Sequence, residues 1–85
     1  MPDYLLNFEI SEDKDQLFIH GDEQGLQFLV GELNKLLSQT KEGHFNHEHL
    51  MTKEWGGNEL SSDSEGGEVL NHVKIYCWKG NKSQI

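Results

Sequence analysis

The sequence predicts a single α+β domain in the order β-β-α-β-β, with a four-stranded, mainly antiparallel sheet and one helix packed on one face. Short segments of alternating apolar and polar residues flank one longer segment with helical periodicity. The chain has 85 residues, a length that suits one domain, residues 1–85, with a thin core. Its composition, 34% hydrophobic and 26% charged, is typical of a soluble globular protein.

The N-terminal part of the chain predicts an antiparallel hairpin. Residues 4–10 form a half-buried strand, because from Leu6 onward apolar and polar residues alternate, with Asn7 and Glu9 facing away from the core. Residues 16–20 form its partner strand beyond a polar, acidic turn. The side chains expected on the core face are Leu6, Phe8, Ile10, Leu17 and Ile19.

A helix is predicted after the hairpin. Asp22 can cap its N-terminus, Lys41 suits its negative C-terminal end, and Gly43 is the expected stop. Gly31 lies in its middle, where a close approach to the sheet would explain a residue that weakens helices. The apolar side chains recur at helical spacing and predict one buried face, made of Leu26, Leu29, Val30, Leu33, Leu36 and Leu37.

Two further strands are predicted, over residues 44–51 and 68–78. Val73, Ile75 and Cys77 are expected to meet the helix. The opposite row of the last strand leaves unusual groups to solvent, namely His72, Lys74, Tyr76 and Trp78. In the third strand, alternation places another mixed set on one face, namely Phe45, His47, His49 and Met51.

The segment between these strands divides into two parts. Residues 55–60, Trp-Gly-Gly-Asn-Glu-Leu, suit an ordered turn in which Trp55 is an anchor and Asn58 and Glu59 offer hydrogen-bonding groups. Alternatively, Trp55 and Leu60 fold back on the sheet edge and Asn58 completes a turn. Residues 61–67 suit a mobile loop, and residues 1–3 and 80–85 suit frayed ends.

Charge and composition exclude several classes of protein. The net charge is −8 and all seven basic residues are lysines, so a nucleic-acid binder is improbable. No apolar run approaches the roughly 18 residues of a membrane span, and the N-terminus lacks the features of a signal peptide, so we expect a cytoplasmic protein. Cys77 is the only cysteine, which excludes an internal disulfide.

Residue type and spacing offer two candidate chemical sites. His47 and His49 form a His-x-His pair that His72 could extend into a metal site, but a fourth ligand is lacking and the signal is weak. Cys77 with His72 or a nearby acid is the only formal candidate for a nucleophile and its base, and Cys77 is expected in the core, where it behaves as a small hydrophobe. The sequence therefore favours a protein that is not an enzyme and has no cofactor.

Two strings of residues resemble the immunity protein 32 family of bacterial polymorphic toxin systems. These are residues 47–60, His-Glu-His-Leu-Met-Thr-Lys-Glu-Trp-Gly-Gly-Asn-Glu-Leu, and residues 71–78, Asn-His-Val-Lys-Ile-Tyr-Cys-Trp; residues 21–26 look similar too. The resemblance implies a small non-enzymatic protein that binds a toxin, neutralises it and so protects the producing cell.

An acidic protein can be steered to a basic toxin, which would be blocked at its active site or at another surface it needs. The candidate partner-binding residues are His47, His49, Trp55, Asn58, Glu59, His72, Tyr76 and Trp78. The competing interpretations are a metal-binding or enzymatic domain and a module that forms a homodimer through the face of Tyr76 and Trp78.

Overall fold

The computed structural model describes residues 3–62 and 67–80, and the predicted α+β class is confirmed there. The tails expected to fray lie largely outside these residues. The strands are β1 (Leu6–Ile10), β2 (Leu17–Gly21), β3 (Phe45–Met51), β4 (Glu68–Val69) and β5 (His72–Trp78). The helix α1 (Glu23–Gln39) follows β2, and a short 3-10 helix, η1 (Lys53–Trp55), follows β3.

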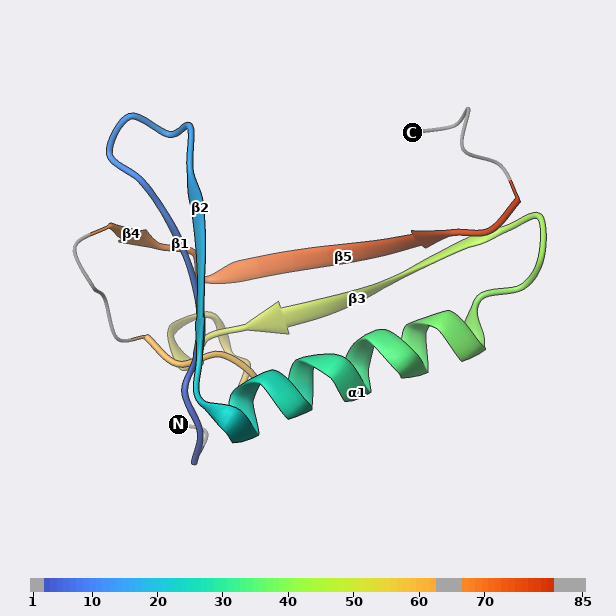
Figure 1. Ribbon diagram of the computed structural model, residues 1–85, viewed down its shortest axis with the longest axis horizontal. Coiled ribbons are helices and arrows are strands. Elements are labelled where there is room, and N and C mark those ends of the chain that lie inside the picture. Colours follow the sequence, from blue (N-terminus) through green and yellow to red (C-terminus); the bar gives the residue numbers. More distant parts are fainter. Residues whose placement is uncertain (1–2, 63–66, 81–85) are drawn as a thin grey trace.

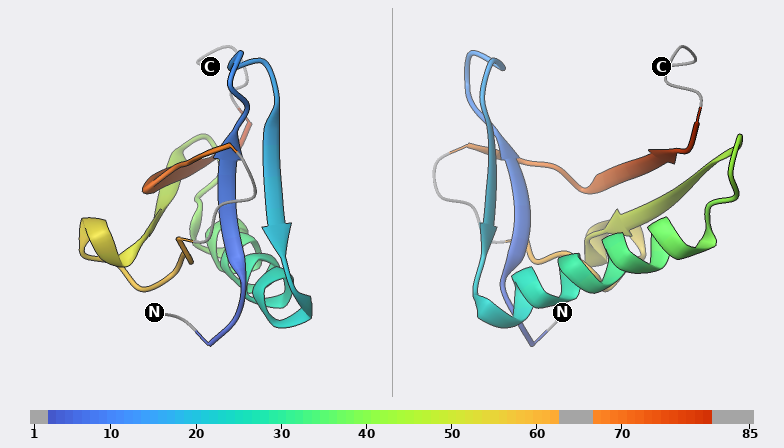
Figure 2. Two further views of the ribbon diagram at one scale, coloured as in Figure 1. Left: turned by 90° about the vertical axis from the view of Figure 1, so that its left-hand side faces the viewer. Right: turned by 45° about the vertical axis from the view of Figure 1, so that its right-hand side comes forward.

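The strands form two antiparallel sheets instead of the expected single one. One sheet has the order β2-β1-β4, and the other consists of β3 and β5. Strands β3 and β5 run alongside α1, while the β1–β2 hairpin stands across one end of this layer (Figures 1 and 2). The helix therefore covers one face of the β3–β5 sheet and leaves the other face open.

The segment predicted as one strand over residues 68–78 is divided between the two sheets. Val69 pairs with Glu9 of β1, and the Leu70 amide donates to the Phe8 carbonyl at 2.8 Å. The next residue, Asn71, instead accepts a hydrogen bond from the Thr52 amide at 3.0 Å. The chain thus changes sheets at this point. Alternation of side chains continues through the bend, so periodicity could not reveal it.

Strand β1 is buried on both faces, contrary to the expectation that Asn7 and Glu9 face solvent. Asn7 and Glu9 are each 1% exposed. The Glu9 carboxylate accepts a hydrogen bond from the Gly67 amide at 2.9 Å and lies 3.7 Å from the His20 ring. Ser61, predicted from the sequence to lie in a mobile loop, is also buried, and its amide donates to the Leu6 carbonyl at 2.8 Å. Residues 63–66 of that loop lie outside the described residues.

Helix α1 begins where the sequence predicts. The Asp22 carboxylate accepts a hydrogen bond from the Gly25 amide at 2.7 Å, which is the capping bond expected of an aspartate at this position. The helix ends earlier than expected, because the amide and hydroxyl of Thr40 both donate to the Leu36 carbonyl. Gly43 has a φ of 78° but lies in the turn to β3, beyond the helix end.

The predicted apolar face of α1 is only partly buried. Leu36 is 2% exposed and Leu29 packs against the core. The other four members of that face are exposed by 37 to 56%, namely Leu26, Val30, Leu33 and Leu37. The explanation proposed for Gly31 is also wrong, because a Cβ atom added there would meet nothing within 4 Å. The sheet covers only one side of a broad apolar arc.

The core lies where the two sheets meet. Its fully buried apolar residues are Leu6, Phe8, Leu50 and Leu60, one pair from β1, one residue from β3 and one from the loop after η1. Side chains of this size contribute roughly 1.5–3 kcal/mol each when fully buried. The core therefore joins the hairpin to the β3–β5 layer and holds the loop that follows η1 in place.

Tyr4 provides a test of this junction. Its hydroxyl donates to the Glu59 carbonyl at 2.9 Å and its ring stacks on Phe28 at 5.2 Å. Burial, and then the nearby Glu59 and Glu32 carboxylates, raise the pKa of Tyr4. Because the fold prefers the neutral phenol, its stabilising contribution is full below about pH 10 and is lost as pH rises through the raised pKa.

We expect Tyr4→Phe to lower the free energy of unfolding by about 1 kcal/mol at neutral pH, since it removes one hydrogen bond and keeps the ring. It should also reduce the loss of stability on going to alkaline pH. Urea unfolding at neutral and alkaline pH measures both effects, with Tyr76→Phe, at an exposed tyrosine, as the control. An unchanged alkaline loss of stability in Tyr4→Phe would contradict this assignment.

Candidate functional site

A row of rings covers the face of the β3–β5 sheet that α1 does not cover. Antiparallel pairing sets His47 opposite Tyr76, and Phe45 opposite Trp78. Paired residues share one face, and alternate residues along each strand do so too. The row also receives Trp55 from η1, so the members of this "ring row" are Phe45, His47, His49, Trp55, His72, Tyr76 and Trp78.

The rings of this row contact one another in sequence from one end of the sheet to the other. Phe45 stacks on Trp78 with centroids 4.7 Å apart, and the His47 and Tyr76 rings are 5.2 Å apart. At the other end, Trp55 lies 6.1 Å from His72. Several members remain open to solvent, since Phe45 is 52% and Trp55 59% exposed. The row is thus an extended aromatic surface on a regular scaffold.

The three histidines at the centre form a chain of close contacts. The Nε2 atoms of His47 and His49 are 3.0 Å apart, and Nδ1 of His49 lies 2.8 Å from Nε2 of His72. Each contact is a hydrogen bond if one nitrogen carries the hydrogen and the other does not. Three neutral rings satisfy both contacts when each ring donates its N–H to the next ring in the same direction, for example from His47 to His49 and from His49 to His72. The arrangement fixes the orientation of the three rings relative to one another.

This geometry bears on the metal interpretation. His49 directs one ring nitrogen at His47 and the other at His72, so the three rings as placed do not converge on a single point. Within residues 3–62 and 67–80, no group of three or more histidine, cysteine or acidic residues is arranged to hold a metal ion. A zinc site here would require His49 to rotate and give up one of its two contacts.

The ring row differs from the protein as a whole in charge. On this face the strands carry Lys74, whose Nζ lies 5.3 Å from the Tyr76 ring centroid, and no carboxylate. Glu48 of β3 points to the other face, where it lies 3.9 Å from Lys35 of α1. The excess negative charge is therefore located elsewhere, and the ring row is an aromatic and imidazole surface.

In segment 55–60, some side chains lie on the surface and others hold the turn in place. Gly56 has a φ of 89°, and a Cβ atom on Gly57 would come within 2.6 Å of Met51. The carboxylate of the candidate binding residue Glu59 accepts a hydrogen bond from the Met51 amide at 3.0 Å, which holds the turn. Leu60 is buried as the folding-back alternative predicts, whereas Trp55 is not. Asn58 is exposed at the tip of the turn.

Cys77 and His72 cannot act as a catalytic pair. Cys77 is five positions after His72 along β5, and an odd offset places the two side chains on opposite faces of the sheet. Cys77 is half-buried on the face that carries Val73 and Ile75, as the sequence predicts. Cys77 is thus separated by the sheet from the three histidines of the ring row.

Two residues of this face, Phe45 and Lys74, were not among the binding residues predicted from the sequence. Phe45 stacks on Trp78, and Lys74 lies over Tyr76. Alternation alone placed Phe45 beside His47 and His49 on one face. What the sequence could not supply is the register between β3 and β5, which makes Phe45 the direct partner of Trp78.

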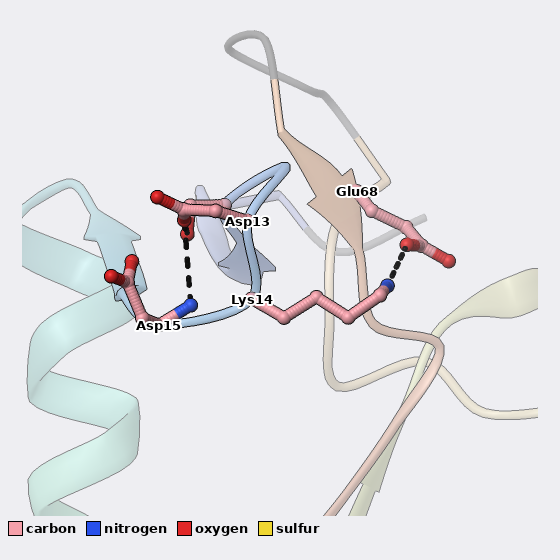
Figure 3. A network of polar contacts seen from close by, with 5 residues as sticks. Asp13, Lys14, Asp15 and Glu68 are labelled. Atoms are coloured by element: carbon pink, nitrogen blue, oxygen red, sulfur yellow. Dashed lines mark hydrogen bonds and ion pairs between the residues drawn. The ribbon is translucent and has the colours of Figure 1, made fainter.

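The acidic turn between β1 and β2 is the second polar feature of the molecule. It bounds a shallow, open depression lined by Ser11, Glu12, Asp13 and Gln16. Hydrogen bonds from the Ser11 hydroxyl and from Asp15 lower the pKa of Asp13. Lys14, at φ 64°, reaches Glu68 of β4 at 3.3 Å (Figure 3). These contacts close the turn on itself and on β4, which is a structural role.

Fold and surface together define a small α+β domain with an exposed row of rings on one open sheet face. The chain matches the immunity protein 32 family over residues 16–73, and it belongs to that family. The match extends from β2 into β5, so it contains Trp55 and all three histidines of the ring row, while Tyr76 and Trp78 lie beyond it. Comparisons with curated proteins and with solved structures gave no match. None of the helices in the described part of the chain is long and apolar enough to cross a membrane.

Proposed function

We propose that this chain is an immunity protein of the cytoplasm that binds a cognate bacterial toxin and neutralises it without chemistry of its own. The ring row is the proposed docking surface, and binding blocks the toxin's active site or another surface that the toxin needs. The observation that carries the proposal is this exposed row of seven rings on the open face of the β3–β5 sheet, in a member of an immunity protein family.

The chemistry of the row suits an interface. Tryptophan and tyrosine bury large areas while losing few rotatable bonds, and they dominate the energetics of many complexes. Phe45, Tyr76 and Trp78 form a stacked cluster at one end, with Trp55 at the other. Between them the histidines supply hydrogen-bonding nitrogens at fixed positions. Asn58 adds an exposed amide in the turn that follows η1.

In this proposal the net negative charge attracts the toxin at long range but makes no contact with it at the ring row. The net charge is −8, while the strands of the ring row carry no carboxylate on that face. A basic toxin would be attracted during approach and would then be held mainly by aromatic contacts. Salt should therefore slow association and leave dissociation nearly unchanged.

Stopped-flow mixing with the product of the toxin gene beside this one tests the electrostatic part. We expect the association rate to fall by about tenfold or more between low and high ionic strength. Dissociation, measured by displacement with unlabelled protein, should change far less. An association rate that does not depend on salt would remove steering from the proposal. Failure of this chain to protect cells that express the toxin would overturn the immunity function itself.

A further inference from the structure

Helix α1 carries an apolar stripe that nothing in the described chain covers. Its members are Leu26, Val30, Leu33 and Leu37, which are 45%, 56%, 37% and 52% exposed. Their separations along the helix are four, three and four residues. This is the alternation of a and d positions in a coiled-coil seam, which places all four side chains in one line.

The stripe is separate from the side of α1 that packs on the sheet. Leu36 is buried and Lys35 lies 3.5 Å from Glu32 and 3.9 Å from Glu48 of β3. The stripe lies roughly a quarter-turn further round the helix. Near Gly21, where a Cβ atom would come within 2.8 Å of Leu26, it meets the end of β2. Ile19, 50% exposed, continues the apolar surface on that strand.

We propose that this stripe is a homodimer interface, in which two copies of α1 pack antiparallel about a two-fold axis between Val30 and Leu33. In that arrangement Leu26 faces Leu37 of the second copy, and Val30 faces Leu33. The same four side chains then serve both copies, as an isologous interface requires. The seam so formed is continuous and wholly apolar.

Charge selects the antiparallel arrangement and a second copy as occupant. Gln27 and Asn34, which flank the exposed side of the stripe, are uncharged, so two acidic chains can meet here without bringing carboxylates together. At the ends, Glu23 at the start of each helix faces the other helix's C-terminal end, close to Lys41. A parallel pair would instead set Glu23 against Glu23.

This dimer leaves the proposed toxin-binding surface free. Helix α1 and the ring row lie on opposite faces of the β3–β5 sheet, so neither interface obstructs the other. The two associations also differ in their response to salt. Two chains of charge −8 repel each other at long range, so added salt should strengthen the dimer while it slows association with a basic toxin.

Sedimentation equilibrium tests the interface with the full chain. We expect a dimer, with twice the monomer mass of 9.8 kDa. Val30→Glu places two carboxylates beside the two-fold axis and should raise the dissociation constant at least about tenfold. Gln24→Glu adds the same charge on the polar side of α1 and should leave it unchanged. Circular dichroism confirms that each variant is folded, which is expected because Val30 is exposed.

A charge exchange tests the antiparallel direction. Glu23→Lys and Lys41→Glu should each weaken the dimer, and the double variant should restore most of the affinity, because the opposite charges face each other again. A wild-type chain that stays monomeric up to roughly 100 µM would overturn the proposal. So would a Val30→Glu variant that dimerises normally but binds the toxin poorly, since the stripe would then belong to the toxin interface.

Discussion

Gly25→Ala is expected to lower the free energy of unfolding by about 3 kcal/mol or more. A Cβ atom at this position would overlap the carbonyl oxygen of Leu5. That carbonyl also accepts the amide of Asp22 at 3.1 Å, and Asp22 caps the helix. The new methyl group cannot be accommodated by a side-chain rotation, since the atom it meets is backbone. Relief requires α1 to move away from the segment that leads into β1.

Gly31→Ala is the matched control in the same helix. The same substitution there meets nothing within 4 Å, and alanine favours helix by up to about 1 kcal/mol over glycine. The two variants should therefore shift the urea midpoint in opposite directions. Equal destabilisation by both would show that glycine acts through local flexibility at both positions, and would contradict the close approach of helix and strand at Gly25.

Tyr76→Ala and Trp78→Ala are expected to weaken toxin binding by about 2 kcal/mol or more each, which is roughly thirtyfold in the dissociation constant. Both rings belong to the stacked cluster with Phe45, and Tyr76 also contacts His47. Tyr76 is 44% exposed, so its truncation should leave the fold intact. Calorimetry with the toxin measures the loss, and circular dichroism checks the fold.

Phe18→Ala controls for the removal of an exposed aromatic ring. Phe18 lies on β2 in the other sheet and is 39% exposed, close to the value for Tyr76. Its removal should leave toxin affinity unchanged if the ring row is the docking surface. Equal losses at Phe18 and Tyr76 would place the interface elsewhere. Loss of structure in Trp78→Ala would assign that ring to the fold, while Tyr76 would still report on binding.

The sequence by itself predicted most of the local structure. The β1–β2 hairpin and strand β3 follow from alternation, the cap at Asp22 follows from carboxylate capping, and α1 follows from its helical repeat. Alternation also placed His47 and His49 on one face of β3, and His72, Tyr76 and Trp78 on one face of β5, and the register shows that these two faces coincide. The family resemblance was equally visible in the order of residues.

Only the tertiary structure decided which surfaces are covered. Periodicity reports that one side of a segment is apolar, but burial depends on whether another element reaches that side. The stripe through Val30 stays open because β3 covers only the adjoining side of α1, whereas Glu9 is buried because the distant residue Gly67 packs against its carboxylate. The bend at Asn71 likewise depends on distant partners: the residues before it pair with β1, and the residues after it pair with β3. Sequence thus determined the elements and the family, and the packing of distant segments determined the ring row and the open helix face.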